Sequence, residues 1–380
     1  MTVRPAIEIN PAECPFARSL TPAYAVCIVE FSRYDRQMLI PGIGIEGQQR
    51  LSEAHVAIVG CGALGCVSAD LLARAGVGHI TLIDRDIVEW SNLQRQSLFA
   101  EADAQQGMPK ALAAAARLKA INSQITVRGL VADLLPANSL HLLDVASTHP
   151  PNAIVDGSDN FATRFLLNDI SISTGIPYLY AGVVGKHATV MPVVPGRGPC
   201  LRCLLPELPP PGSTPTCDTA GVLGPIVTIA AAVQTAQALE LLLDRSAYVV
   251  PGLIELQLNP FHTRTYALSA DVGCACCSKR DFSFLSADDA QADATLCGRD
   301  AVQIASSGCH SLDLPHITAG LQAHADVQIW PFMLRASFRS QMSELGLPIA
   351  LTLFRDGRAI VQGTRRLDLA RSIYSRFVGG

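Results

Sequence analysis

The stretch HVAIVGCGALG, residues 55–65, decides the fold of this chain. Its apolar residues form an expected strand, which runs directly into the glycine pattern Gly60-x-Gly62-x-x-Gly65. An Ala/Leu-rich helical stretch follows, and a second apolar strand, residues 79–83, leads to Asp84. A strand, a glycine turn, a helix and a second strand within about 30 residues predict a βαβ unit with a phosphate-binding turn.

The glycine turn and Asp84 indicate a nucleotide. Glycines permit a tight turn and a close backbone approach, and the N–H groups at a helix start favour a phosphate. Asp84 comes 19 residues after Gly65, where a carboxylate can accept hydrogen bonds from ribose hydroxyls. This pattern alone suits a nicotinamide or flavin dinucleotide, or glycines that serve only chain packing.

Strand and helix signals continue to alternate along the chain. We expect a helix over residues 108–120 and further strands near residues 125–131, 153–156 and 188–194. This alternation predicts an α/β fold with a doubly wound, mostly parallel, Rossmann-like sheet. A helical stretch at 31–52 precedes the first strand, and a long apolar helix at 221–243 follows a proline-rich loop.

Composition changes suggest four segments. Residues 1–30 are a proline-containing extension, and residues 31–283 form the nucleotide-binding domain. Residues 284–294 are acidic and Ala/Ser-rich, as a linker is, and residues 295–380 form a small α+β domain. In that domain we expect strands at 295–304 and 349–361, the second bent at Asp356-Gly357, and a terminal helix at 365–378.

The bulk composition excludes several classes of protein. Of 380 residues, 49% are hydrophobic and 16% are charged, which is typical of a globular chain and not of a disordered one. The net charge of −4 gives no overall attraction to nucleic acid. No apolar run reaches the roughly 18 residues that span a bilayer, and we see no signal peptide, so we expect a cytoplasmic protein. Twelve cysteines there favour metal ligands or reactive thiols over disulfides.

Polar side chains follow the expected strands and begin the helices after them. Singly, each is best interpreted as a solvated surface group, but together they favour a site. Cations beside a carboxylate suit a triphosphate with Mg²⁺, which a hydride-transfer enzyme does not need. The residues concerned are Asp86, Asn92, Arg95, Gln96, Lys110, Asp159, Asn160 and Arg164.

Several ordered motifs resemble one known family over roughly residues 31–280. They are RYDRQ at 33–37, the glycine loop, DRD at 84–86, SNLQRQ at 91–96, GMPK at 107–110, residues 156–164, two CxxC pairs, and Cys217 before AGVLG at 220–224. The chain is similar to the ThiF/MoeB/HesA adenylyltransferases, relatives of the ubiquitin-activating enzymes.

The resemblance implies ATP-dependent adenylation of the C-terminal glycine carboxylate of a ubiquitin-like sulfur-carrier protein ending in Gly-Gly, with release of pyrophosphate. The activated carrier would supply sulfur for cofactors, thiolated tRNA or secondary metabolites, with a sulfur donor such as a cysteine desulfurase as a further partner. No membrane and no direct nucleic-acid partner are expected.

The resemblance also assigns roles. Asp84 would bind the ribose, Asp159 would bind Mg²⁺, and Arg36 would enter the neighbouring subunit's site, which implies a homodimer. The candidate catalytic residues are Arg36, Arg95, Lys110, Asp159 and Cys217. The candidate cofactor-binding residues are Gly60, Gly62, Gly65, Asp84, Asp86, Asn92, Arg95, Gln96, Lys110, Asp159 and Asn160.

Two CxxC pairs, Cys200/Cys203 and Cys274/Cys277, have 70 intervening residues. Four thiolates suit structural Zn²⁺, although two free reactive pairs or two local disulfides also fit the spacing. Cys276 could replace Cys277, but only Cys277 has two residues between it and Cys274. Many members of the resembled family carry this four-cysteine site, which favours zinc.

Cys217 follows five prolines in residues 205–216, so we expect an exposed loop. It is either an ordinary loop cysteine or a thiolate that attacks the activated carbonyl. In the resembled family, a cysteine here can form a thioester or an acyl disulfide with the carrier, and some members work without it. Cys61 and Cys66 flank the glycine loop and are expected as small buried hydrophobes. None of the nine histidines has metal-ligand spacing.

The last segment does not resemble a rhodanese domain. Residues 351–361 resemble the C-terminal module of some bacterial ThiF-like proteins, which could help to dock the carrier. The terminal Gly379-Gly380 is interpreted as a frayed end and not as a substrate for self-adenylation. Three alternatives stay open: adenylation of a small carboxylate or a modified tRNA base, a non-catalytic scaffold, and a dinucleotide oxidoreductase.

Overall fold

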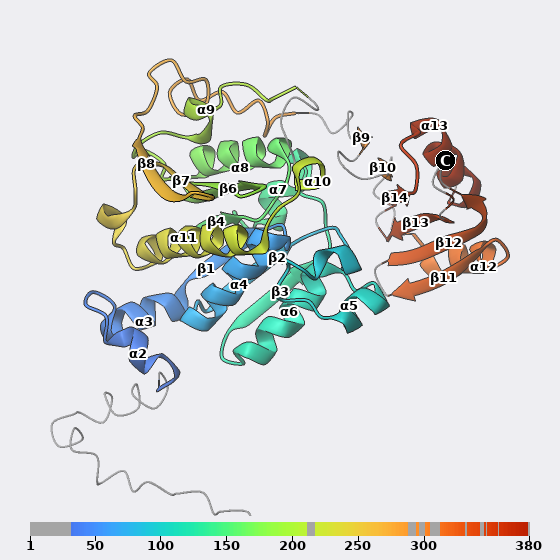
Figure 1. The fold of residues 1–380 in the computed structure, drawn as a ribbon, viewed down its shortest axis with the longest axis horizontal. Helices are drawn as coiled ribbons and strands as arrows, with labels where there is room; N and C mark the ends of the chain where they lie inside the picture. The colour runs from blue at the N-terminus through green and yellow to red at the C-terminus, as the bar shows by residue number, and fades with distance from the viewer. Residues whose placement is uncertain are drawn as a thin grey trace, which may run out of the picture.

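The computed structural model describes residues 32–210, 217–287, 294–295, 301–304, 312–330, 333–342, 346, 348–355 and 357–378. They form an eight-stranded mixed sheet with helices on both faces and a separate six-stranded antiparallel sheet (Figure 1). Our expectations for residues 1–30, for most of the linker and for Gly379-Gly380 lie outside the described residues.

The large sheet has the strand order β3-β2-β1-β4-β5-β6-β7-β8. The first five strands in this order are parallel, and β6, β7 and β8 continue the sheet in antiparallel register. The expected doubly wound, mostly parallel sheet is confirmed. Its strands are β1 His55–Val59, β2 His79–Ile83, β3 Thr126–Leu130, β4 Ala153–Asp156, β5 Tyr178–Val184, β6 His187–Val193, β7 Gly252–Leu258 and β8 Phe261–Ala267.

Helices cover both faces of this sheet, so its central strands are buried twice. On β1, Val56 and Ile58 belong to one core cluster, and Ala57 and Val59 belong to the other. A strand buried on both faces has no polar alternation, which explains its continuous apolar sequence. One face carries α4 (Ala63–Ala75), α6 (Lys110–Ile121) and α11 (Gly224–Leu242), and the other carries α7 (Pro136–Leu142), α8 (Phe161–Thr174) and α9 (Leu201–Leu204).

The expected helical stretch at 31–52 forms three pieces, and Gly42, with a left-handed φ of +87°, lies in the break between the second and the third. The pieces are η3 (Ser32–Tyr34), α2 (Asp35–Met38) and α3 (Gly44–Glu53). Asn122 Nδ2 donates to Tyr34 Oη at 2.8 Å, and Gln37 Nε2 donates to the carbonyl of Ala75 at 2.9 Å. These contacts place α2 at the amino ends of the strands.

Helix α11 is 19 residues long and reaches a mean hydropathy of 1.4. By length and composition it is the one helix among the described residues that could cross a membrane, so the expectation that no apolar stretch is long enough was wrong. The helix lies along β5, β6 and β7 and beside α4, and 39% of its apolar window is buried. Packing on the sheet therefore accounts for only part of its apolar composition.

The second sheet has the order β11-β12-β13-β14-β10-β9. The expected strand at 295–304 is two separate strands, whereas the expected strand at 349–361 is a paired hairpin, β13–β14. Two helices cover one face, where Leu321 and Ile373 join its core. The elements are β9 Ala294–Thr295, β10 Ala301–Ile304, α12 Leu314–Leu321, β11 Ala325–Trp330, β12 Met333–Met342, β13 Pro348–Phe354, β14 Ala359–Gln362 and α13 Leu367–Phe377.

Candidate functional site

The glycine loop between β1 and α4 is packed so tightly that side chains cannot fit. Gly60 has a φ of +91°, and a Cβ on it would lie 2.6 Å from the carbonyl carbon of Gly157. A Cβ on Gly65 would lie 1.9 Å from the carbonyl oxygen of Gly60. The loop therefore presents bare backbone at the carboxyl end of β1. The first N–H groups of α4 have no intrahelical acceptor there, which is the arrangement that accepts a phosphate.

Asp84 follows β2 and ties this loop to the next. Its carboxylate accepts the backbone N–H of Cys61 at 2.6 Å and that of Asp86 at 2.7 Å. Burial raises the pKa of Asp84, and the nearby Lys110 ammonium counteracts this. The carboxylate thus lies beside the glycine loop, at the distance along the chain that suits a ribose contact.

Lys110 begins α6 and points back to the end of β2. Its Nζ lies 3.0 Å from Asp86 Oδ2, and its backbone N–H donates to the Asp86 carbonyl at 2.9 Å. The Lys110 side chain is only 3% exposed. One ammonium beside two carboxylates leaves an excess of negative charge at this sheet edge, which a bound cation would offset.

Residues 90–96 form a short turn beside these charges, with η4 at Trp90–Asn92. Asn92 and Gln96 are buried, and Asn92 Oδ1 accepts the backbone N–H of Glu89 at 3.0 Å. The Gln96 Oε1 atom is buried without a hydrogen-bond partner among the described residues. Arg95 donates to the carbonyl of Ser91 at 2.8 Å. The Arg95 guanidinium can donate to phosphate oxygens, whereas the unpaired Gln96 Oε1 is an acceptor and requires a donor.

A network at the end of β4 shapes the next loop, and the sequence analysis singled out its Arg164 but not its hydrogen bonds. The Asp156 carboxylate accepts from Tyr178 Oη at 2.6 Å and from both the N–H and the hydroxyl of Ser158. Arg164 donates to the Ser158 carbonyl at 3.1 Å. Burial raises the pKa of Asp156, and Arg164 counteracts this. These bonds fix the turn that carries Asp159.

Asp159 itself is exposed, and its charge acts on Arg85 and Arg164. The next residue, Asn160, has a structural task that the sequence did not reveal. Its side chain accepts the N–H of Thr163 at 2.8 Å and caps α8. The carboxylates available for a divalent cation near the nucleotide loop are therefore Asp159 and Asp86, the second of which is paired with Lys110.

One expected catalytic residue does not meet the others, and the side chain of a second is not described. Arg36 is exposed on α2, at the amino ends of the strands, whereas Gly60 follows a carboxyl end. Five residues of β1 at about 3.3 Å each separate these edges by roughly 16 Å. Cys217 begins α10 (Cys217–Ala220), but its side chain lies outside the described residues. The segment after it is anchored, since the Gly185 N–H donates to the Gly221 carbonyl at 2.8 Å.

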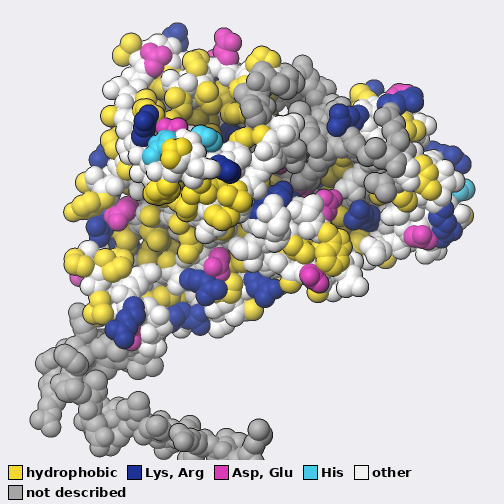
Figure 2. All heavy atoms as spheres, viewed as in Figure 1, with side chains coloured by type: hydrophobic (Ala, Val, Ile, Leu, Met, Phe, Trp, Pro, Cys, Tyr) yellow, Lys and Arg dark blue, Asp and Glu magenta, His cyan; other side chains and the backbone are white. Residues whose placement is uncertain are grey.

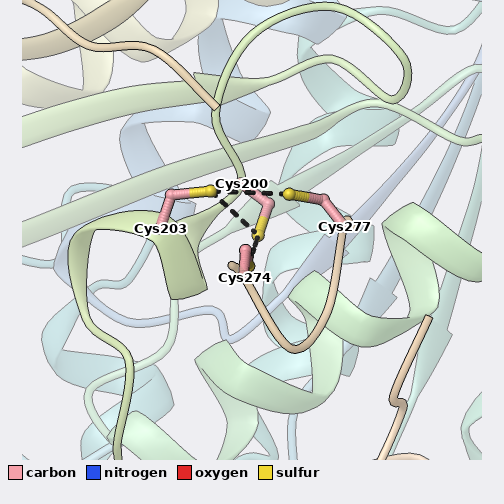
Figure 3. Close-up of side chains that lie close together, drawn as sticks. All are labelled: Cys200, Cys203, Cys274 and Cys277. Atoms are coloured by element: carbon pink, nitrogen blue, oxygen red, sulfur yellow. Dashed lines mark hydrogen bonds between the residues drawn. The ribbon is translucent and has the colours of Figure 1, made fainter. Parts of the chain in front are cut away.

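The two CxxC pairs meet and form one cluster (Figure 3). The Sγ atoms lie within 4.8 Å of one another, with separations of 3.6 Å between Cys200 and Cys274 and 3.4 Å between Cys203 and Cys277. Zinc with four bonds of about 2.3 Å places its sulfurs about 3.8 Å apart. The cluster is compatible with zinc, and none of the described cysteines forms a disulfide.

Cys276 lies next to the cluster, where it contacts both Cys200 and Asn168. Asn168 Nδ2 donates to its Sγ at 3.3 Å, and Asn168 Oδ1 accepts the N–H of Leu201 at 2.8 Å. One asparagine thus connects the two cysteine segments. Cys61 and Cys66 are buried, as expected, and burial raises the pKa of Cys66 to about 12.

This arrangement agrees with the matches to known proteins. The ThiF family model matches residues 34–276. The chain belongs to the ThiF family. It is 44% identical to the sulfur carrier protein ThiS adenylyltransferase of Bacillus subtilis, over 91% of this chain and 99% of that protein. It is also 41% identical to the sulfur carrier protein adenylyltransferase of Thermus thermophilus, over 56% of this chain and 78% of that one.

A solved structure, MccB of E. coli with MccA-N7isoASN, superposes with a TM-score of 0.57 and 25% identity. It covers 65% of this ThiF-family chain and 74% of its own. The Bacillus match covers far more of the chain, so it includes much of the C-terminal sheet. That sheet is therefore shared with at least one ThiF relative.

Proposed function

We propose that this chain uses ATP to adenylate the C-terminal glycine carboxylate of a ubiquitin-like sulfur-carrier protein and releases pyrophosphate. The observation that carries the proposal is the 44% identity to a ThiS adenylyltransferase over nearly the whole length of both chains. The convergence of the glycine loop, Asp84 and the Lys110–Asp86 pair at one sheet edge supports it.

The residues present fit ATP. Gly60, Gly62 and Gly65 would face the phosphates through their backbone, and Asp84 would accept from the ribose hydroxyls. Lys110, Arg95 and the side-chain amides would contact phosphate oxygens. The Lys110 ammonium at the carboxyl ends of the strands supports this assignment, since Asp86 holds it beside the glycine loop and Asp84.

Asp159 would bind Mg²⁺, with Asp86 near it. Carboxylate oxygens are the ligands that Mg²⁺ prefers, and the ion would neutralise phosphate charge. The rigid turn built on Asp156 supports this role, because it presents Asp159 from a fixed backbone. Asn160 would contact the nucleotide, and its side chain also caps α8.

The chemistry needs positioning and charge stabilisation rather than proton transfer. A carboxylate oxygen of the carrier attacks the α-phosphorus, a new P–O bond forms, and the bond to the β-phosphate oxygen breaks. Pyrophosphate leaves with that electron pair, and the product is an acyl adenylate. Negative charge grows on the phosphoryl oxygens in the transition state, and Lys110 and Arg95 would stabilise it.

Arg36 would act on the site of a second copy. Within one chain it lies at the wrong edge of the sheet, so a homodimer would bring it to the partner's nucleotide. Exposed apolar surface supports a dimer: Leu39 is 72% exposed beside Arg36, and Figure 2 shows apolar side chains gathered over α11. On that helix Pro225, Ala232 and Ala236 are exposed.

Cys217 would react after adenylation, either as the thiolate that attacks the acyl adenylate and expels AMP, or as the thiolate that takes the outer sulfur of a donor persulfide and releases the donor's thiolate. The position of the segment after Cys217 supports this role. Gly224, at the start of α11, lies near the carbonyl of Gln94 in the turn 90–96. A sulfur donor such as a cysteine desulfurase would then supply the sulfur. ATP and reduced thiols together indicate the cytoplasm as the compartment.

Zinc on the four cysteines would be structural. It would join the segment after β6 to the segment after β8, and no fifth position would be open to substrate. Burial raises the pKa of Cys203, so the thiolates that a metal requires need the charge of the cation to form. The proposed adenylation domain is residues 31–283, with residues 295–380 as a second domain.

ATP–pyrophosphate exchange tests the function. The purified chain is mixed with labelled pyrophosphate, MgATP and a carrier that ends in Gly-Gly, with the same carrier lacking its last glycine as control. Exchange only with the intact carrier is expected, and Cys217→Ala should keep exchange and lose sulfur transfer. Tight NAD binding without exchange would contradict the proposal. The named relatives do not favour the small-carboxylate, tRNA-base or scaffold alternatives.

A further inference from the structure

The C-terminal sheet touches the turn that carries the proposed phosphate ligands. Gln362, on β14, donates from Nε2 to Glu89 Oε1 at 3.1 Å. Arg335, on β12, donates to Gln362 Oε1 at 3.1 Å. The Glu89 carboxylate also acts on the Arg335 charge. A chain of two hydrogen bonds therefore connects the second sheet to the segment after β2.

An apolar contact surrounds this chain of bonds. Ile87 packs with side chains from the face of the C-terminal sheet that α12 and α13 leave uncovered, namely Ala301, Met333, Phe354 and Ile360. A cavity of about 20 Å³ lies between Glu89, Asp86, Gln362 and this face. The contact is thus close-packed, with space for about one water molecule.

Glu89 in turn fixes Asn92. The Glu89 N–H donates to Asn92 Oδ1 at 3.0 Å, and the Asn92 N–H donates to the Glu89 carbonyl at 2.9 Å. The Asn92 carbonyl accepts the N–H groups of Arg95 at 3.1 Å and Gln96 at 2.9 Å. Three of the expected phosphate ligands therefore share one small turn, and Glu89 begins it.

We propose that Gln362 and Arg335 are positioning residues for adenylation, which place Asn92, Arg95 and Gln96 by holding Glu89. This inference rests on the proposed function. In this arrangement the C-terminal sheet is part of the nucleotide site. Glu89 begins the turn of proposed phosphate ligands, and its carboxylate would repel phosphates unless donors such as Gln362 and Arg335 hold it.

Exchange of the hydrogen-bonding pair gives the test. Gln362→Glu places two carboxylates together, and adding Glu89→Gln restores an amide opposite a carboxylate with Arg335 still in reach. Arg339 lies on β12, the strand that carries Arg335, but it pairs with Asp326 at the surface. Arg339→Gln is therefore the matched control. For each variant of the full chain, MgATP affinity is measured by calorimetry, and KM values are measured by exchange.

We expect Gln362→Glu to raise the KM for ATP about tenfold and to weaken MgATP binding equally. The KM for the carrier should not change. The double variant should return the KM for ATP to within about threefold of the wild-type value, and Arg339→Gln should match wild type.

An unchanged KM for ATP in Gln362→Glu would overturn the positioning role and leave the adenylation proposal intact. A raised KM that the double variant does not restore would overturn it too, since the effect would then come from general destabilisation. If the wild-type chain bound no MgATP and showed no exchange, the proposed function itself would be wrong.

Discussion

Lys110 and Asp86 form a buried ion pair at 3.0 Å, 24 residues apart in sequence and directly at the end of the glycine-loop strand pair. Asp84 lies close enough to both that its own pKa responds to their charges. The Asp84 and Asp86 carboxylates both attract the Lys110 ammonium and so hold its side chain in place. The pair therefore holds the Lys110 side chain at the carboxyl ends of the strands, where the nucleotide is proposed to bind.

Lys110→Met should reduce ATP–pyrophosphate exchange about 10²- to 10³-fold, because the transition state loses a preorganised cation. Lys110→Arg should keep part of the activity. Exchange at saturating ATP measures both. Lys119→Met is the control, since Lys119 is an exposed lysine on the same helix. Equal activity of Lys110→Met and Lys119→Met would refute the phosphate role.

Asp159→Ala should abolish measurable exchange while the thermal midpoint stays unchanged, because the side chain is exposed. A variant of the neighbouring residue, Asn160, distinguishes an effect on metal binding from an effect on folding. Asn160→Ala removes the α8 cap and should lower stability by about 1 kcal/mol. Exchange and thermal unfolding are measured on both. Retained exchange in Asp159→Ala would show that the cation is held elsewhere.

Arg36→Ala should be inactive alone, and so should Asp159→Ala, but a mixture of the two should regain activity. Random pairing gives heterodimers in which one site has both an intact Asp159 and the partner's arginine, so about a quarter of wild-type sites should work. Exchange is measured after the variants are unfolded and refolded together. No recovery would place Arg36 outside the partner's site.

Cys203→Ser should lower the zinc content from one ion per chain and lower the thermal midpoint, because a four-sulfur site adds folding free energy. Metal analysis and calorimetry measure the two effects. Cys276→Ser should keep the zinc, since Cys276 bonds to Asn168. Loss of zinc in Cys276→Ser with retention in Cys277→Ser would exchange the ligand assignment.

The histidines near the amino ends of β1 and β2 predict that the stability of the protein depends on pH. His55 Nδ1 donates to the carbonyl of His149, and Nε2 accepts from Thr81, so the buried ring is satisfied in its neutral form. Burial lowers the pKa of His55, and the nearby rings of His149 and His79 lower it further.

Because the folded pKa of His55 lies below the unfolded value near 6.5, the unfolded chain binds more protons in acid. The free energy of unfolding should therefore be largest above about pH 7 and fall as the pH drops through 6.5 toward the folded pKa. Thermal midpoints at pH 7.5 and 5.5 should differ less in His55→Gln than in wild type or in the exposed His316→Gln. An equal difference in all three proteins would contradict this.

Much of the fold and part of the candidate site follow from local pattern. The stretch at 55–65 predicts its own structure from local sequence. Its apolar run favours a strand and its glycines permit the tight turn that follows. The helix at 31–52 was wrong in detail, since it forms three pieces, with the left-handed Gly42 in the break between the second and the third. Strands β5, β7 and β8 were not expected, although β5–β6 and β7–β8 pair as local antiparallel hairpins. Strand β8 has no apolar pattern to reveal it, because most of its residues are exposed.

The sequence by itself determined the βαβ nucleotide loop, the two CxxC pairs and the family, because each is a short ordered pattern with a physical meaning of its own. Only the tertiary structure decided that four cysteines meet within 4.8 Å, that three histidines gather at one edge, and that Asn160 caps a helix. It also decided that Gln362 reaches Glu89, 273 residues away. Such contacts depend on how two sheets pack, and no local pattern records that.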